Sequence, residues 1–373
     1  MKSIRIYCKN DGRYHDVPKG ATLEEVYETL ELNLPCCVTS CKVNNRVEGL
    51  HYTINDSRDL EYLTLASPSG LRTYTRSLFF VLYKAVRDLY PEAELRIGTP
   101  VAGGYFCRLA LPGGITPEVP ERLRRRMAEI VASDLPFRRV TAHTTDAIEV
   151  FRRQGFTRKV LLLESIGDLY THYYTLGDTV DYFYSALLLR TGQLTVYDLV
   201  PFGEGLLLRV PDSEHPERLR PMTDQHKMFS VFQEQHRRQE ILGCTTVGEL
   251  NTLIRADHTN DLVNVAEALQ EKQIAQIADH IASHDALRVV LIAGPSSSGK
   301  TTFAKRLSVQ LMACGKKPVS ISLDNYFVDR TLTPLDETGD YDFEHIEALN
   351  LPLFNDQMNR LLVGEEVELP RYD

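Results

Sequence analysis

The sequence predicts a multi-domain protein that combines α+β and α/β folds. Its 373 residues are more than one domain usually holds, so we expect two or three domains. Short alternating strands and a helix within the first 66 residues indicate a small α+β domain. Residues 287–293 form a run that is apolar except for Arg288 and is followed by a helical pattern, which is typical of a buried strand in the parallel sheet of an α/β domain.

Composition and charge narrow the class of protein. The chain is 43% hydrophobic and 25% charged, as in ordinary globular proteins, and its formal net charge of −9 disfavours a large nucleic-acid-binding surface. No apolar run approaches the ~18 residues of a membrane span, and the N-terminus lacks the apolar core of a signal peptide, so we expect no membrane partner. Seven cysteines, an odd number, suggest reduced thiols and a cytoplasmic location.

Residues 1–66 predict a β-grasp domain. A turn signal, Asn-Asp-Gly, separates two alternating segments, and Thr22 with Glu25 forms a capping box at the start of a helix. The expected order is strand, strand, helix, strand, strand, at residues 3–8, 12–17, 21–30, 43–47 and 60–65. This segment resembles the TGS domain, the N-terminal module of threonyl-tRNA synthetase. The resemblance includes no catalytic residue, so a regulatory or packing role is favoured.

Residues 67–215 resemble the second, editing-type domain shared by threonyl- and alanyl-tRNA synthetases. The apolar-striped helix before Pro91 and the turn at residues 177–181 carry the resemblance. That family hydrolyses mischarged tRNA with an H-x-x-x-H plus C-x-x-x-H cluster. When the chain is aligned on those two segments, the four positions of the cluster hold Arg76, Phe80, Phe183 and Leu187. A cation and three apolar groups cannot bind a divalent metal, so the resemblance predicts that editing activity is lost.

Two further features of this segment each have two interpretations. An arginine-rich run could contact RNA phosphates, although a solvated helix face is the favoured interpretation. It consists of Arg122, Arg124, Arg125 and Arg126. His143 and His172 lie apart from any ligand pattern, and structural or surface roles are favoured over catalysis.

Residues 216–285 are expected to form a helical connector. Residues 225–242 and 261–281 both have apolar positions at helical spacing. Gly243 and Gly248 mark a break between the two helices.

The most specific motif of the chain lies in residues 286–373. Residues 294–301 fit G-x-x-x-x-G-K-[ST], the phosphate-binding loop. Its glycines let the backbone curl so that N–H groups face an anion, and the following helix adds its dipole. The residues expected to bind the phosphates of ATP are Gly294, Pro295, Ser296, Ser297, Ser298, Gly299, Lys300, Thr301 and Thr302. Lys300 is expected to reach the β- and γ-phosphates, and the Thr301 hydroxyl to bind Mg²⁺.

Residues 318–323, Pro-Val-Ser-Ile-Ser-Leu, predict another strand, with Asp324 at its carboxyl end. In an open parallel sheet this end faces the ligand crevice, so we expect Asp324 on the same edge as the phosphate loop. A carboxylate there could accept a proton from a substrate hydroxyl or hold a water of Mg²⁺. The alternative is an acid that only caps a strand or helix.

Four segments together resemble the uridine kinase and phosphoribulokinase family: the loop, residues 322–327, residues 341–350 and residues 369–373. This family transfers the γ-phosphoryl group of ATP to a hydroxyl of a ribose or sugar phosphate. The resemblance gives Asp324 the position of the general base. It places three residues in the substrate site: Tyr372 against the base, Glu344 where the family has an aspartate, and Phe327 where uridine kinases have a tyrosine. The residues at Glu344 and Phe327 differ from those of the family, so it is open whether uridine itself is the substrate.

The predicted function is therefore an ATP- and Mg²⁺-dependent, uridine-like nucleoside kinase with Lys300 and Asp324 as catalytic residues. Residues 286–373 are shorter than the roughly 200 residues that such a kinase domain needs, so we expect this chain to be an inactive fragment of it. The alternative is a nucleotide-gated regulatory or tRNA-binding protein without kinase activity. A tRNA-editing hydrolase is disfavoured. The acceptor and the oligomeric state are left open.

Overall fold

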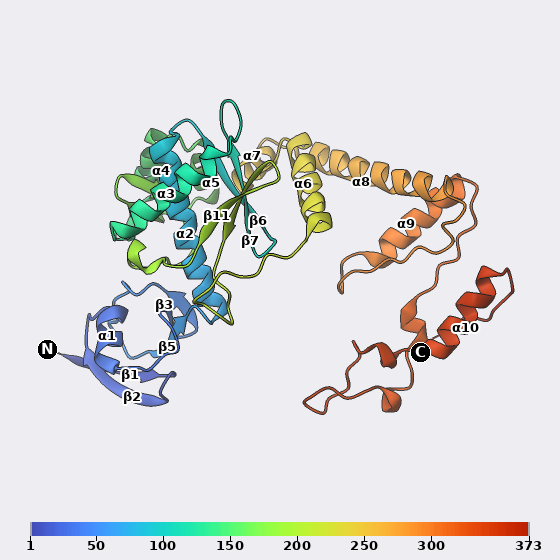
Figure 1. Ribbon diagram of the computed structural model, residues 1–373, viewed down its shortest axis with the longest axis horizontal. Coiled ribbons are helices and arrows are strands. Elements are labelled where there is room, and N and C mark those ends of the chain that lie inside the picture. Colours follow the sequence, from blue (N-terminus) through green and yellow to red (C-terminus); the bar gives the residue numbers. More distant parts are fainter. Residues whose placement is uncertain (1, 372–373) are drawn as a thin grey trace. The chain divides into compact units, whose positions relative to one another are not determined.

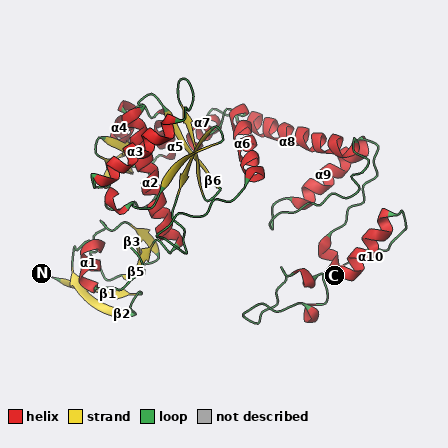
Figure 2. Cartoon of the chain, in the orientation of Figure 1, coloured by secondary structure: helices red, strands yellow, loops and turns green. Residues whose placement is uncertain are grey.

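Two units make up the chain, Met1–His258 and Thr259–Asp373. The structure is a computed structural model that describes residues 2–371 (Figure 1). Strands and helices alternate in the first unit, whereas the described part of the second unit holds helices and loops (Figure 2). The boundary falls inside residues 216–285, the stretch predicted as a helical connector. No helix of residues 2–371 combines the length and the apolar character needed to cross a membrane.

The N-terminal module is a five-stranded sheet covered by one helix. Its strands have the order β2-β1-β5-β3-β4, with β1 and β5 parallel and the other neighbours antiparallel. The predicted capping box is confirmed, because the Thr22 N–H donates to Glu25 Oε2 at 2.8 Å and the Glu25 N–H donates to Thr22 Oγ1 at 3.2 Å. The elements are β1 (Ser3–Cys8), β2 (Arg13–Pro18), α1 (Leu23–Leu30), β3 (Val38–Val43), β4 (Arg46–Glu48) and β5 (Asp59–Thr64).

The prediction of one continuous strand at residues 43–47 is wrong. The chain reverses there, and β3 and β4 form a hairpin around Asn44 and Asn45. Both asparagines have positive φ, 47° and 68°. A two-residue turn with positive φ at both positions suits the twist of a hairpin, and asparagine tolerates this conformation better than most residues.

The second module of the first unit is built around helix α2 (Pro68–Leu89), most of whose side chains are buried. The helix begins at residue 68, directly after Ser67, which caps it by accepting the Gly70 N–H at 3.1 Å. Two antiparallel sheets belong to this module, with orders β11-β12-β7-β6 and β10-β9-β8. The elements are β6 (Glu94–Val101), β7 (Gly104–Ala110), α3 (Glu118–Ala132), β8 (Arg138–His143), α4 (Thr144–Arg153), α5 (Thr157–Ile166), β9 (Tyr170–Leu176), β10 (Thr179–Asp181), η1 (Thr191–Gln193), β11 (Asp198–Phe202) and β12 (Gly205–Arg209).

Two further helices pack on this module. Phe229 of α6 (His226–Ile241) lies edge-to-face against Phe106 of β7, with ring centroids 4.8 Å apart. Gly248 of α7 (Val247–Arg255) lies so close to α5 that an added Cβ would be 2.7 Å from the Leu162 nitrogen. These contacts make both helices part of the first unit.

Lys84 of α2 is a buried cation whose ammonium has two carboxylate partners. Its Nζ atom lies 2.7 Å from Asp178 Oδ1 and 3.2 Å from Asp88 Oδ1. The hydrogen bond from Lys84 holds the pKa of Asp178 below its usual value. An acid with a lowered folded-state pKa stabilises the fold above its unfolded-state pKa, and this stabilisation is lost as the pH falls through the folded-state pKa.

We therefore expect the variant Asp178→Asn to be less stable than the wild type at pH 7. The difference should stay within about 1 kcal/mol, because water screens this exposed carboxylate. It should shrink as the pH falls from about 5 to about 2, because the wild-type carboxylate, with its lowered pKa, takes up its proton only below about pH 4. Denaturant unfolding across this range measures it, with Asp16→Asn, a change at another exposed aspartate, as the control. A difference that is equal at both ends of the range contradicts the prediction.

Helices of the second unit pack along a short apolar seam. Ile274 and Ala278 of α8 are buried against Leu307 and Leu311 of α9. The elements of this unit are α8 (Thr259–Ala282), α9 (Lys300–Ala313), η2 (Leu323–Tyr326), η3 (Arg330–Leu332), η4 (Ile346–Ala348) and α10 (Leu351–Leu362).

The parallel sheet predicted for residues 286–373 is not formed in the part of this segment that the structure describes. Residues 287–293 and 317–322 lie in irregular backbone and pair neither with each other nor with another strand of residues 2–371. Val290 and Leu291 are consequently 44% and 86% exposed. A buried strand requires a neighbour on each side for its N–H and C=O groups, which an apolar run by itself does not supply.

Candidate functional site

The phosphate loop has the curled backbone that its sequence predicts. Ser297 and Gly299 both have positive φ, 59° and 87°. The Ser298 N–H donates to the Pro295 carbonyl at 3.2 Å and closes the turn. A Cβ added to Gly294 would lie 2.7 Å from Ser298 Oγ, so a larger residue there meets the loop itself. Alternation of left-handed and right-handed residues is the backbone pattern that turns N–H groups inward on an anion.

Helix α9 begins directly at the end of this loop. Gly299 is its N-cap residue, and no side chain caps the helix. The first N–H groups of a helix have no partner inside it, so they and the helix dipole favour an anion at this end. The N–H groups of the loop and of the helix start therefore form one surface that favours an anion.

Lys300 lies over the loop and contacts it directly. Its Nζ atom donates to the Gly294 carbonyl at 2.6 Å and to the Pro295 carbonyl at 3.1 Å. A phosphate oxygen carries a full charge and accepts a stronger hydrogen bond from an ammonium than a neutral carbonyl does. The side chain is thus already at the loop, where a bound triphosphate would compete with the two carbonyls.

Thr301 is the residue of the loop whose hydroxyl is predicted to bind Mg²⁺. It follows Lys300 in the first turn of α9 and is exposed. Mg²⁺ is commonly held by one or two protein oxygens together with phosphate oxygens and water, so a single hydroxyl is a sufficient protein contribution. Within residues 2–371 no three His, Cys, Asp or Glu side chains gather as a metal-binding group.

Asp324 lies on a short 3₁₀ helix, η2, and not at the end of a strand. The strand predicted at residues 318–323 is absent from the described structure, so the position of Asp324 is set by the contacts of the 3₁₀ helix that carries it. Buried Tyr326 anchors η2 to α10, because its hydroxyl donates to Gln357 Oε1 at 2.6 Å. No hydrogen bond or ion pair between described residues links Asp324 to the phosphate loop, and its carboxylate is exposed.

Of the three residues expected to contact the acceptor, the structure describes Phe327 and Glu344. Phe327 is half-buried next to η2 and forms a β-bridge with Leu349. Glu344 is exposed, and its N–H donates to Asp342 Oδ1 at 3.0 Å. The segments of Phe327 and Glu344 are joined, since the Val328 N–H donates to the Ala348 carbonyl at 2.9 Å. Tyr372 lies outside the described residues.

In the first unit, the four positions aligned with the editing cluster come together in space. Arg76 donates from Nη1 to the Ala186 carbonyl at 3.3 Å, next to Leu187. Phe80 packs against Phe183 with ring centroids 5.4 Å apart. Phe80 and Leu187 have no exposed surface. Apolar side chains therefore fill the place where a metal-binding or acid–base cluster would lie.

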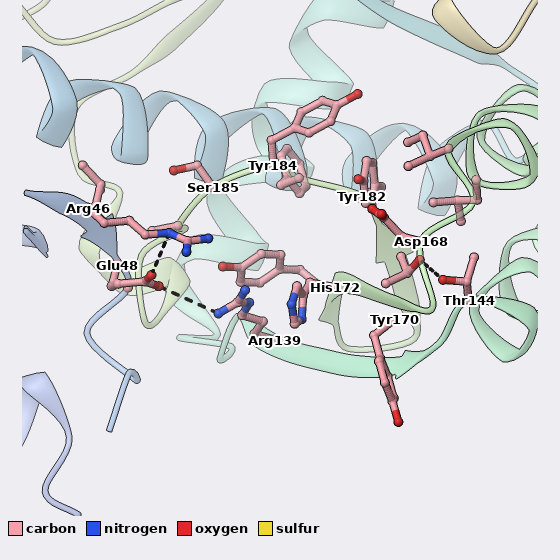
Figure 3. A pocket seen from close by; sticks show the side chains of 18 residues that line it. Arg46, Glu48, Arg139, Thr144, Asp168, Tyr170, His172, Tyr182, Tyr184 and Ser185 are labelled. Carbon is pink, nitrogen blue, oxygen red and sulfur yellow. Dashed lines mark hydrogen bonds and ion pairs between the residues drawn. The ribbon is translucent and has the colours of Figure 1, made fainter. Parts of the chain in front are cut away.

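A cavity of about 340 Å³ lies between the N-terminal module and the second module (Figure 3). It was missed by reasoning from the sequence, which treats His172 as a structural or surface residue. Four of its five acidic and basic side chains come from β4, β8 and β9, and no local motif connects strands so far apart in the chain. These four are Arg46, Glu48, Arg139 and His172, and the fifth, Asp168, lies in the loop before β9.

Comparison with known proteins gives a different result for each part of the chain. Residues 289–373 match the sequence model of the Phosphoribulokinase / Uridine kinase family. The N-terminal region is similar to threonine–tRNA ligases. The ligase of Desulforamulus reducens is 28% identical over 64% of this chain and 39% of its own length. The ligase of Clostridium novyi is 30% identical over 48% of this chain and 28% of its own length. The ligase of Symbiobacterium thermophilum is 28% identical over 54% of this chain and 31% of its own length. The chain thus spans well under half of these relatives. The resemblance of the C-terminal part to the kinase family and that of the N-terminal region to threonyl-tRNA synthetases are confirmed.

Proposed function

We propose that this protein transfers the γ-phosphoryl group of ATP to a hydroxyl group of a nucleoside or a related sugar. One observation carries the proposal. The segment that matches the kinase family contains a curled loop with Lys300 folded onto it, at the uncapped start of α9. A loop of this kind serves to hold a triphosphate, and the family match supports transfer of its terminal group.

The phosphate loop supplies binding and charge in this proposal. Its N–H groups hold the β- and γ-phosphates, and Lys300 moves from the carbonyls of Gly294 and Pro295 to the phosphate oxygens. Thr301 would hold Mg²⁺ through its hydroxyl, and the metal would offset the charge of the phosphates. The gain in rate comes from positioning and from donors arranged in advance.

Asp324 acts as the general base. The acceptor hydroxyl gives its proton to the Asp324 carboxylate while its oxygen forms a bond to the γ-phosphorus. The bond from this phosphorus to the bridging oxygen breaks, and ADP leaves with the electron pair. Phe327, Glu344 and Tyr372 are the proposed contacts of the acceptor, with the Tyr372 ring against a base and Glu344 at ribose hydroxyls.

The N-terminal modules have a regulatory or scaffolding role in this proposal and do not catalyse editing. Phe80, Phe183 and Leu187 supply no ligand or acid–base group at the aligned positions. A second candidate function is that of a nucleotide-gated regulator that binds tRNA, and the similarity of the N-terminal region to threonine–tRNA ligases favours it.

A phosphorylation assay with a panel of ribonucleosides and sugar phosphates tests the proposal. It uses ATP, Mg²⁺ and the protein in the form that its gene encodes. We expect stoichiometric formation of ADP and of one phosphorylated acceptor, and no turnover once Mg²⁺ is removed with a chelator. ATP hydrolysis without any phosphorylated acceptor, together with salt-sensitive binding of tRNA, would favour the second candidate.

A further inference from the structure

The cavity between the modules of the first unit has two chemically different ends (Figure 3). Arg46, Glu48 and Arg139 gather at one end, and Tyr182 and Asp168 lie at the other. Its volume of about 340 Å³ is within the range of small-molecule sites. A second hollow of about 490 Å³ shares the charged end and adds Arg58.

The charged end has more cations than anions. Glu48 is shared by two guanidinium groups, with Arg46 Nε 3.4 Å and Arg139 Nη1 3.9 Å from its carboxylate oxygens. One carboxylate offsets one of these charges, so a positive charge remains for a ligand. Arginine's planar fork of donors matches the oxygens of a phosphate group.

The charge of Arg139 also contributes to the pKa values of two histidines. Burial, and after it the charge of Arg139, lowers the pKa of His172. The same two causes lower the pKa of His51 nearby. Arg76 adds to the field, since it lies beside Ala186 of the cavity wall and has no carboxylate partner among the described residues.

The opposite end offers aromatic rings to a ligand. Tyr182 and Tyr184 lie edge-to-face with centroids 5.1 Å apart, and Tyr184 is 79% exposed. Tyr170, also on the cavity wall, is 52% exposed. Exposed rings at the mouth of a cavity provide stacking surfaces for a planar ligand. Asp168 on the same side can accept hydrogen bonds from hydroxyl or amino groups of that ligand.

We propose that this cavity binds a free nucleoside monophosphate. Its phosphate would contact Arg46 and Arg139, its base would stack on Tyr184, and Asp168 would accept hydrogen bonds from the sugar or base. A simple anion would leave the tyrosine end unused, and an uncharged aromatic compound would leave the arginines without a ligand. The proposal is independent of the kinase function, because the cavity and the phosphate loop belong to different units.

Calorimetric titration of the full chain tests the proposal. All proteins carry Lys300→Ala, so that binding at the phosphate loop is suppressed. The ligands are UMP, AMP, their nucleosides and inorganic phosphate. We expect at least one monophosphate to bind about tenfold or more tightly than its nucleoside or inorganic phosphate, since both ends of the cavity contribute.

Three substitutions in that background localise the binding. Arg139→Ala should weaken the binding of the monophosphate about tenfold or more, because a charge-assisted hydrogen bond to the phosphate is lost. Tyr184→Ala should weaken the binding of the monophosphate and of its nucleoside by about fivefold or more, because stacking is lost. It should leave the binding of inorganic phosphate unchanged. Arg138→Ala, which changes an exposed arginine of β8 that does not line the cavity, is the matched control and should have no effect.

Several outcomes would overturn the assignment. They are no binding in the Lys300→Ala background, equal binding of phosphate and monophosphate, and monophosphate binding that Tyr184→Ala leaves unchanged. A short single-stranded RNA ending in the same nucleotide is a further arm, and binding of this RNA about tenfold more tightly than the monophosphate would assign the site to RNA ends instead. Tyr184 is so exposed that its variant is expected to fold even if Arg139→Ala, which removes an ion pair between the modules, does not.

Discussion

Asp324→Asn is expected to lower kcat for phosphoryl transfer about 100- to 10,000-fold, the usual contribution of a general base. The amide keeps the size of the side chain but cannot accept the acceptor's proton. ATP binding should be unchanged, because no described contact joins Asp324 to the phosphate loop. Initial rates at saturating acceptor, together with a titration of ATP, measure both quantities.

Asp329→Asn is the matched control for this variant. Asp329 is exposed, lies five residues further along the chain, and accepts a hydrogen bond from the Thr331 N–H at 3.0 Å. It has no proposed catalytic role, so its replacement should leave kcat within about twofold, as expected for a surface substitution. Equal rates for Asp324→Asn and the wild type would remove Asp324 from the proposed mechanism and leave the phosphate loop as the supported part of the site.

Lys300→Ala is expected to reduce phosphoryl transfer by about 100-fold or more, the usual cost of removing a donor at developing charge. The affinity for ATP should fall as well, because the variant loses a cation at the phosphates. Lys300 is exposed, and the described hydrogen bonds of its side chain go to loop carbonyls, so unfolding transitions should not change. Steady-state kinetics and ATP titration provide the measurement.

Lys305→Ala on the same helix separates a local effect from a general loss of charge. Lys305 is exposed in α9, one turn beyond the residues of the loop. Its variant should bind ATP and turn over like the wild type. If both lysine variants lose activity to the same extent, the positive charge of the helix matters and the particular position of Lys300 does not.

Features that depend on neighbours in the sequence were the ones that could be predicted. The capping box of Thr22 and Glu25 needs only residues three positions apart. The curled loop before Lys300 likewise follows from glycine spacing, and Gly299 has the positive φ that this predicts. The turn at Asn44 and Asn45 is local too, but the strand predicted there includes both asparagines.

Features that depend on distant partners were not predicted. The apolar run at residues 287–293 has the composition of a buried strand, yet a strand exists only when another one pairs with it. The 3₁₀ turn that holds Asp324 depends on the contact of Tyr326 with Gln357, 31 residues away. The cavity of the first unit requires Arg46 and Arg139 to meet across two modules. The local sequence around either arginine does not predict this contact.

The most direct test of the proposed phosphoryl transfer is a crystal structure of the protein with Mg²⁺, a non-hydrolysable ATP analogue and the best acceptor of the panel. We expect an Asp324 carboxylate oxygen about 3 Å from the acceptor hydroxyl. Lys300 should have left the Gly294 carbonyl for the phosphates. A complex in which the triphosphate occupies the loop while Asp324 stays more than about 6 Å from the acceptor hydroxyl, beyond even a water-mediated proton transfer, would contradict the proposed mechanism.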